Sequence, residues 1–189
     1  MKKIACLGWG SLVWDPRGLP VRRPWFNDGP LLPIEFARHS EGERITLVIV
    51  PDKPDVAYVR SLWALMSIDD LEKAKKELAE REGKIGVENI GYWSKDNNSG
   101  HRYVEIMEEW AIQKNLEAVI WTALPPKFDK PDGKVPTVED ILSFLKRKDL
   151  PYEKRKFAEE YIRKAPLQID TVYRRKIDNE FNWPSLASY

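Results

Sequence analysis

Two glycines and a serine surround a tryptophan where the first apolar run of the chain ends, in the stretch LGWGSLVW. Gly8 and Gly10 carry no side chain, so backbone N–H groups around them can point together into a cavity. Such a nest binds anions or carbonyl oxygens, and the hydroxyl of Ser11 adds a further donor or acceptor. With Trp9 and Leu12 these residues form a candidate binding turn at positions 8–12. A plain tight turn or a β-bulge is the alternative interpretation.

A glutamate at the end of a predicted helix is the second candidate. Residues 67–82 contain no glycine or proline, and at 100° per residue Leu71, Leu78 and Glu82 lie within about 40° of one another. A carboxylate on an apolar face is costly unless it is paired or functional, and burial raises carboxyl pKa values toward the range of a general base. We therefore interpret Glu82 as a candidate general base. The alternative is that its side chain reaches solvent or Arg81 from a frayed last turn.

The histidines and the cysteine lack a supporting pattern. His39 and His101 have no Cys, His or carboxylate neighbours at metal-ligand spacing, so we predict surface or turn histidines and no metal site. Cys6 lies in the middle of an apolar run, which favours an inert core thiol.

Two weaker constellations remain. A candidate anchor for a substrate carboxylate is provided by Arg22, Arg23 and Arg38. The balanced charge of the chain makes solvated arginines the simpler interpretation. A triad of Ser11, His39 and Asp15 has no support from its spacing.

Short apolar runs predict the strands that position these residues. The run at residues 4–7 ends at Gly8, so it predicts a buried strand directly before the candidate turn. Branched and aromatic residues predict further strands, the first two as a pair. These runs are 32–38, 44–50, 56–66, 87–93, 101–112 and 116–124.

Three helices complete the pattern. Ser67 and Asp70 form a candidate capping box for a helix that Gly83 ends. Thr137 and Asp140 form a second capping box, and a further helix over 152–164 presents three apolar residues. These are Phe157, Tyr161 and Ile162. The chain beyond Pro166 has no assignable pattern, and the whole order predicts an α+β protein with a curled or closed sheet.

Length and composition favour one domain over residues 1–189. The chain has 31 basic and 30 acidic residues, a formal net charge of +1, which favours neither nucleic acid nor an anionic membrane as a partner. A single cysteine and the absence of a signal-peptide pattern predict a cytoplasmic location. No apolar run approaches the roughly 20 residues that a membrane helix needs. We therefore expect a soluble protein whose oligomeric state the sequence leaves open.

The stretch LGWGSLVW resembles the (F/A)-x-YGSL-x-W or YGSN signature of the γ-glutamylcyclotransferase-like superfamily, which includes glutathione-specific and γ-glutamylamine cyclotransferases. The segment AEREG resembles the one that carries the catalytic glutamate of that family, and FARHSEGERITLVIVPD is similar to its second and third strands. The order of these pieces agrees over residues 3–164.

The resemblance implies a small mixed β-barrel flanked by helices, with residues 166–189 as a C-terminal extension. It implies that the 8–12 turn and Glu82 meet in one pocket, where the enzyme releases 5-oxoproline from a small γ-glutamyl amide or amine. Gly8, Trp9, Gly10, Ser11 and Leu12 would bind the substrate and Glu82 would be catalytic. No metal or organic cofactor is implied.

The sequence also departs from the family pattern. Trp9 stands where the family usually has tyrosine, so an indole N–H, which only donates, replaces a phenolic hydroxyl. The tyrosine that some members carry after the last strand is missing from PPKFDKPDGKVPTVED. These departures keep open a second hypothesis, a domain of the same fold that binds a small ligand or a protein without catalysis.

Overall fold

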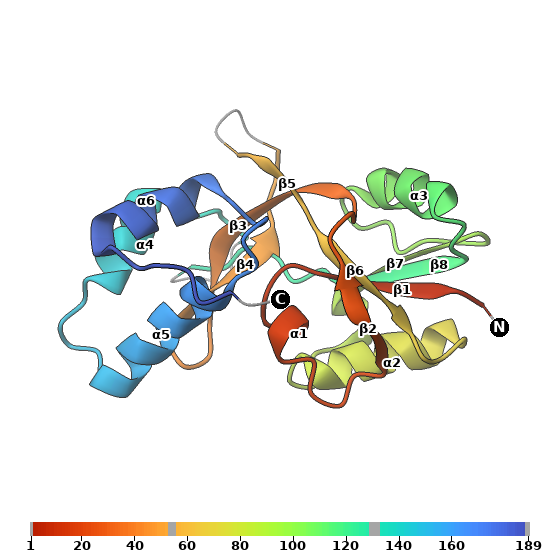
Figure 1. Ribbon diagram of the computed structural model, residues 1–189, viewed down its shortest axis with the longest axis horizontal. Coiled ribbons are helices and arrows are strands. Elements are labelled where there is room, and N and C mark those ends of the chain that lie inside the picture. Colours follow the sequence, from red (N-terminus) through yellow and green to blue (C-terminus); the bar gives the residue numbers. More distant parts are fainter. Residues whose placement is uncertain (1, 53–55, 129–132, 188–189) are drawn as a thin grey trace. The chain divides into compact units, whose positions relative to one another are not determined.

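A computed structural model describes residues 2–52, 56–128 and 133–187 (Figure 1). The chain divides into two compact units, each built from two segments. Unit 1 comprises Met1–Leu32 and Arg60–Leu124, and unit 2 comprises Pro33–Val59 and Pro125–Tyr189.

Unit 1 is organised around a mixed five-stranded sheet. The strand order is β2-β6-β1-β8-β7, in which β1 and β8 are parallel and the other neighbours are antiparallel. The strands are β1 (Ile4–Gly8), β2 (Val21–Phe26), β6 (Leu62–Met66), β7 (Ile90–Ser94) and β8 (Ala118–Thr122). In the described part of the chain, β2 and β7 are the edges of this sheet.

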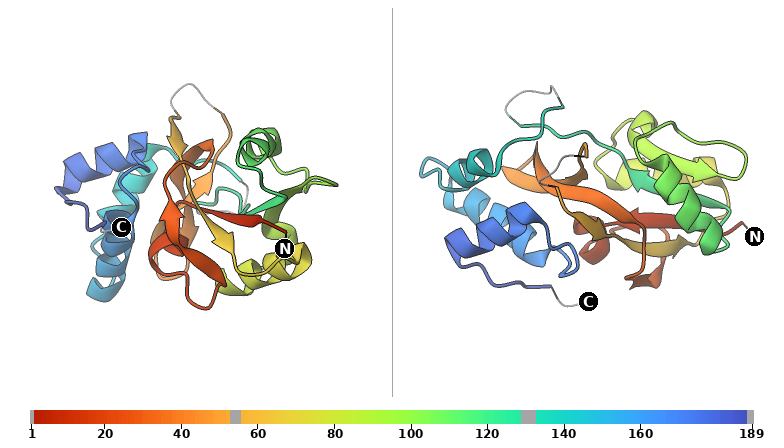
Figure 2. Two further views of the ribbon diagram at one scale, coloured as in Figure 1. Left: turned by 45° about the vertical axis from the view of Figure 1, so that its right-hand side comes forward. Right: turned by 90° about the horizontal axis from the view of Figure 1, so that it is seen from above.

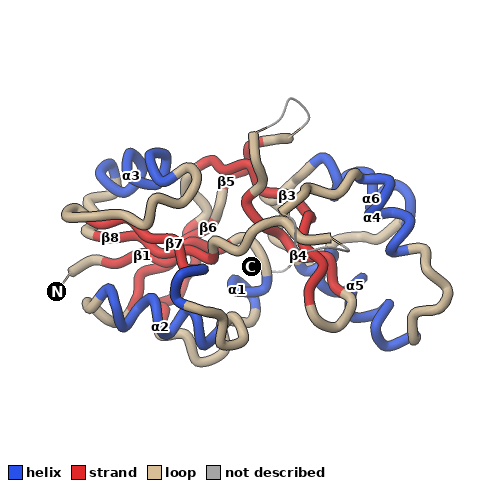
Figure 3. The backbone as a smooth tube through the Cα atoms, turned by 180° about the vertical axis from the view of Figure 1, so that it is seen from behind, coloured by secondary structure: helices blue, strands red, loops and turns tan. Residues whose placement is uncertain are grey.

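Helices α2 (Leu71–Arg81) and α3 (Val104–Gln113) cover opposite faces of this sheet (Figures 1 and 3). Successive strand residues point to opposite faces, so alternate residues of β1 and β8 can pack against different helices. Cys6 and Ile120 belong to the core cluster that includes Leu78 of α2. The apolar face of α2 therefore packs under the strand that leads into the 8–12 turn.

The ends of α2 differ in how well the sequence predicted them. Asp70 is the N-cap and its carboxylate accepts from Lys73 N at 2.8 Å, so the predicted capping box on Ser67 is wrong. The backbone N–H of Ser67 instead donates to Pro20 O, next to β2. Gly83 follows the helix with φ of +92°, a left-handed conformation that favours glycine, and the predicted end of the helix is confirmed.

The strand predicted over 101–112 is a helix instead, α3. Its buried residues are Val104, Met107, Trp110 and Ala111. They recur every three or four residues, which is the spacing of a helix face, although the branched and aromatic residues favoured a strand. The strand predicted over 56–66 is two strands, β5 (Tyr58–Arg60) and β6, which belong to different sheets.

Unit 2 contains most of a three-stranded sheet in the order β4-β3-β5. The predicted strand pair is confirmed as β3 (Leu31–Ser40) and β4 (Arg44–Ile49), which are antiparallel. Gly42, with φ of +74°, lies in the turn that joins them.

The helices of unit 2 gather on one side of β3 and β4 (Figures 1 and 2). They are α4 (Val138–Leu145), α5 (Tyr152–Lys164) and α6 (Val172–Phe181). The predicted capping box of Thr137 and Asp140 is present at α4, and α5 has the predicted bounds. Tyr161 and Ile162 are buried, but Phe157 is half exposed, so the predicted apolar face of α5 is narrower than expected.

Three elements had no counterpart in the sequence prediction. They are β2, the single helical turn α1 (Ser11–Trp14) and α6, which lies in the segment predicted as an extension; a short 3-10 helix, η1 (Val87–Asn89), precedes β7. The predicted α+β class is confirmed as a mixed architecture with two sheets and helices.

Candidate functional site

The 8–12 turn joins the end of β1 to the start of α1. Gly10 is the N-cap of α1, and its carbonyl accepts from Val13 N at 3.0 Å. The first N–H groups of a helix have no acceptor within it, so those of Ser11 and Leu12 are available to another group. Trp9 and Leu12 are buried and Ser11 is partly buried. The turn is therefore a mostly buried segment whose first helical N–H groups have no acceptor within α1.

Gly8 lies against the indole of Trp25, a residue of β2. A Cβ on Gly8 would be 2.8 Å from Cζ3 of Trp25 and 3.1 Å from a methyl group of Val13. Glycine is thus required here for close packing, and Gly8 does not have the positive φ that would require it for backbone conformation. The buried Nε1 of Trp25 has no hydrogen-bond partner in the described part of the chain.

Arg81 joins the glutamate to the turn. Its Nη1 donates to Oε1 of Glu82 at 2.6 Å, and its Nη2 donates to Oγ of Ser11 at 3.2 Å and to the carbonyl of Asp15 at 2.6 Å. The Arg81 side chain is 5% exposed and that of Glu82 is 18% exposed. Arg17 in turn donates to the carbonyl of Arg81 at 3.3 Å. One guanidinium therefore connects the end of α2 with both ends of α1.

The charges of Arg81 and Glu82 affect the pKa of the Cys6 thiol in β1. Burial raises the pKa of the Cys6 thiol, the carboxylate of Glu82 raises it further, and Arg81 opposes them. Cys6 packs in the same core cluster as Leu78 of α2, the helix that ends at this pair. Cys6 is buried and free, as predicted for a core thiol.

The structure brings the predicted site residues into one unit and links two of them. Glu82 follows the last residue of α2 as its C-cap, and its Arg81-mediated contact reaches Ser11. Glu82 contacts Arg81, as the alternative interpretation expected, and its side chain is only slightly exposed, as its place on the apolar face of the helix expected. Sequence reasoning missed the bridging role of Arg81. The signal was its helical position, about 60° from Leu78 at the edge of the apolar face.

The remaining candidates have other surroundings. His39 lies near the end of β3, 3.2 Å from a carboxylate oxygen of Glu43 and against the ring of Phe144, and its side chain is partly exposed. His39 belongs to unit 2, whereas Ser11 and Asp15 of the hypothetical triad belong to unit 1. Burial lowers the pKa of His101, and its Nδ1 has no partner among the described residues.

The three arginines predicted as a candidate carboxylate anchor differ in their exposure to solvent. Arg22 and Arg23 are exposed on β2, as the solvated interpretation predicted. Arg38 donates to the carbonyl of Pro125 at 2.7 Å, and burial lowers its pKa.

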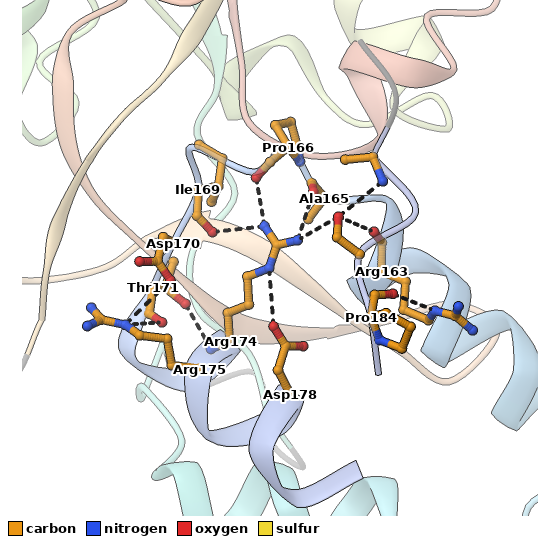
Figure 4. Close-up of polar contacts among 12 residues, drawn as sticks. Arg163, Ala165, Pro166, Ile169, Asp170, Thr171, Arg174, Arg175, Asp178 and Pro184 are labelled. Carbon is orange, nitrogen blue, oxygen red and sulfur yellow. Dashed lines mark hydrogen bonds and ion pairs between the residues drawn. The ribbon is translucent and has the colours of Figure 1, made fainter. Parts of the chain in front are cut away.

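A second group of buried charges lies in unit 2, in the segment that the sequence left unassigned (Figure 4). The guanidinium of Arg174 donates to three backbone carbonyls and one serine hydroxyl, and its Nε is 3.8 Å from Asp178. The carbonyls belong to Ala165, Pro166 and Ile169. These contacts occupy the donors with the chain's own backbone, so the cluster is structural.

Glu35 is a buried carboxyl group of β3 that also lies in unit 2. It accepts from the hydroxyl of Thr171 at 2.5 Å, from Tyr173 N at 3.2 Å and from Phe36 N at 2.8 Å. Burial raises its pKa to about 7, and the hydrogen bonds oppose that rise. Glu35 therefore caps the start of α6 from a neighbouring strand.

No group of three or more His, Cys, Asp or Glu residues that could hold a metal ion occurs in the part of the chain that the structure describes. Among the same residues, no helix is both long and apolar enough to cross a bilayer. Comparison with known protein families, with curated proteins and with solved structures found no match for this chain.

Proposed function

We propose that the protein is a γ-glutamylcyclotransferase-like enzyme that releases 5-oxoproline from a small γ-glutamyl amide or amine. Glu82 is the catalytic acid and base, and residues 8–12 bind the γ-glutamyl group. The observation that carries the proposal is the link from Glu82 through Arg81 to Ser11, which joins the two candidate halves of the site.

The reaction is an internal acyl transfer. The α-amine of the substrate attacks its own γ-carbonyl carbon, a C–N bond forms in the five-membered ring, and the bond to the leaving amine breaks. Glu82 accepts the proton that the attacking amine loses and returns it to the leaving amine, so atoms and charge balance without a co-reactant. Because both reacting groups belong to one molecule, holding it folded supplies much of the acceleration.

The turn supplies the electrostatic part of this mechanism. The N–H groups at the start of α1 are free of intrahelical acceptors, and the α1 backbone is held by Arg81 at Asp15. Donors that are fixed before the reaction stabilise an oxyanion without the cost of reorganising. The glycine at position 10 has no side chain that would stand between the backbone and a substrate carbonyl oxygen.

The same proposal includes a specific fold for unit 1. We propose that the strands of unit 1, which form an open mixed sheet with edges β2 and β7, correspond to the strands of the γ-glutamylcyclotransferase-like barrel. The support is the order of its parts: a first strand that ends in the GWGS turn, followed by a helix that ends at the glutamate.

A protein of the same fold that binds a small ligand or a protein without turnover is the second candidate. Trp9, which is buried, replaces the usual tyrosine of the family and removes a hydroxyl acceptor from the turn. A ligand that raises the unfolding temperature without being consumed favours this candidate.

The test is a measurement of 5-oxoproline release from glutathione, γ-glutamyl amino acids and γ-glutamyl-ε-lysine. With an active donor, Glu82→Gln is expected to lower kcat about 10²- to 10⁴-fold, because the amide cannot accept the proton. The matched control is Glu80→Gln, which changes an exposed carboxylate of α2 and is expected to keep wild-type activity. No product from any donor, or equal activity of both variants, would contradict the proposal.

A further inference from the structure

We propose that Arg81 is a positioning residue that holds the carboxylate of Glu82 at the start of α1 and leaves Oε2 as the oxygen that exchanges protons with substrate. This inference rests on the proposed function. In this proposal Arg81 fixes the position of the Glu82 carboxylate, and Oε2 of that carboxylate takes up and returns the proton.

The guanidinium of Arg81 is shared between the glutamate and the turn. Nη1 faces Glu82, while Nη2 faces Ser11 Oγ and Asp15 O, so the planar fork spans both sides at once. A rigid fork of five donors can do this, whereas a lysine ammonium has one nitrogen on a flexible stem. Movement of Glu82 relative to α1 would therefore break at least one of these bonds.

The two carboxylate oxygens of Glu82 are not equivalent. Oε1 accepts the short bond from Arg81, and Oε2 has no hydrogen-bond partner among the described residues. A proton acceptor must be within hydrogen-bond reach of the proton that it takes. Oε2 is the oxygen that is free to do so, and Arg81 fixes the direction in which it points.

Arg81 lies in a more costly environment than a residue that only stabilises the end of a helix would need. Its side chain is 5% exposed, and its Nε has no partner in the described part of the chain, which is costly for a buried donor. A purely stabilising residue at the end of α2 could instead extend into solvent, as Lys84 does beyond Gly83. The contacts that the guanidinium makes with both Glu82 and α1 account for this costly burial.

The kinetic test uses Arg81→Lys, which keeps the charge but not the fork. We expect kcat to fall on the order of 10- to 100-fold with KM changed less than threefold, because misplacement of a proton acceptor affects the chemical step more than binding. Ser11→Ala removes one acceptor of the fork and is expected to give a smaller fall in kcat. In the Arg81→Lys background, Ser11→Ala is expected to have little further effect, because the two changes disrupt the same contact.

A stability control separates positioning from folding. Ile90→Val shortens a buried side chain of β7 in the same unit and is expected to lower stability while leaving kcat unchanged. Activities are compared per folded molecule, with the folded fraction taken from thermal unfolding. If Arg81→Lys keeps wild-type kcat, or loses activity only in proportion to its folded fraction, the role of Arg81 is overturned while the proposed function stands.

An NMR measurement decides the geometry without turnover. Arg81 Nη–Hη signals are expected to be resolved in the wild type, because hydrogen bonds on both sides slow rotation of the guanidinium, and to broaden in Glu82→Ala, which removes the acceptor of Nη1. Averaged signals in the wild type would overturn the positioning role. If no donor yields 5-oxoproline, the proposed function fails and the catalytic part of the Arg81 proposal fails with it, whereas resolved signals would still support the fixed geometry.

Discussion

Gly8 lies in the candidate binding turn, but close packing explains why this position is a glycine. The ring of Trp25 and a methyl group of Val13 occupy the space that a Cβ would need. The glycine lets the Trp25 ring of β2 approach the end of β1 closely. The packing of the turn therefore depends on a neighbour from another strand.

We expect Gly8→Ala to lower the free energy of unfolding by about 1 to 3 kcal/mol, since the Trp25 ring must move to admit a methyl group. Denaturant unfolding measures the effect. Gly18→Ala is the matched control, because no atom lies within 4 Å of its Cβ position, and its stability should be unchanged or slightly raised. Equal stability of Gly8→Ala and wild type would show that the ring is not closely packed there.

Among the elements, α6 depends on a partner far away in the sequence. Its N-terminal groups are capped by Glu35, a carboxyl group on β3, as well as by its own N-cap Thr171. Burial of Glu35 makes this cap sensitive to protonation, because the charged form loses its hydration. The attachment of α6 is thus linked to pH.

The pH dependence has a definite sign. The pKa of Glu35 rises from an ordinary value near 4.5 to about 7 in the folded protein. Its contribution to stability is therefore fully present below pH 4.5 and is lost as pH rises through 7, a change of about 3 kcal/mol. The stability of wild type relative to Glu35→Gln, from urea unfolding, should fall by that amount between pH 4.5 and 7.5.

The control for this experiment is Glu153→Gln on the exposed surface of α5, for which no comparable pH-dependent difference is expected. A difference between wild type and Glu35→Gln that is constant, or that grows with pH, would show that the hydrogen bonds to Glu35 outweigh its desolvation.

For the whole molecule, the C-terminal residues are part of a compact unit, because Arg174 joins α6 to the chain after α5 and to Ser185 in the tail (Figure 4). Arg163 adds to this attachment by donating to Pro184 O at 2.9 Å, and its carbonyl accepts from Leu186 N at 2.7 Å. Residues 166–187 therefore contribute to the fold of unit 2.

Arg174→Leu is expected to cost about 3 kcal/mol or more of unfolding free energy, because it leaves buried carbonyls without donors. The adjacent Arg175→Leu, which removes an exposed partner of Asp170, is expected to cost less than about 1 kcal/mol. Denaturant unfolding compares the two, and amide hydrogen exchange should report lost protection in α5 and α6 for Arg174→Leu. Similar costs for both variants would argue against the role of the buried cluster.

Local signals predicted the elements whose ends and faces are encoded nearby. Thr137 and Asp140 specify the start of α4, Gly83 specifies the end of α2, and alternating branched residues specify the pair β3 and β4. The run at 101–112 was misassigned because its aromatic and branched residues favour a strand, while the burial that decides for α3 comes from packing on β7 and β8.

The sequence by itself determined the chemical candidates, the GWGS turn and a glutamate at the end of a helix, because glycine and carboxylate chemistry are properties of residue types. Only the tertiary structure decided that Arg81 connects them, since it lies 70 residues from Ser11 and 66 from Asp15. It likewise decided that Glu35 caps α6, across 136 residues to Thr171. Contacts at such separations depend on how strands and helices pack, and local residue patterns do not encode which partners packing will bring together.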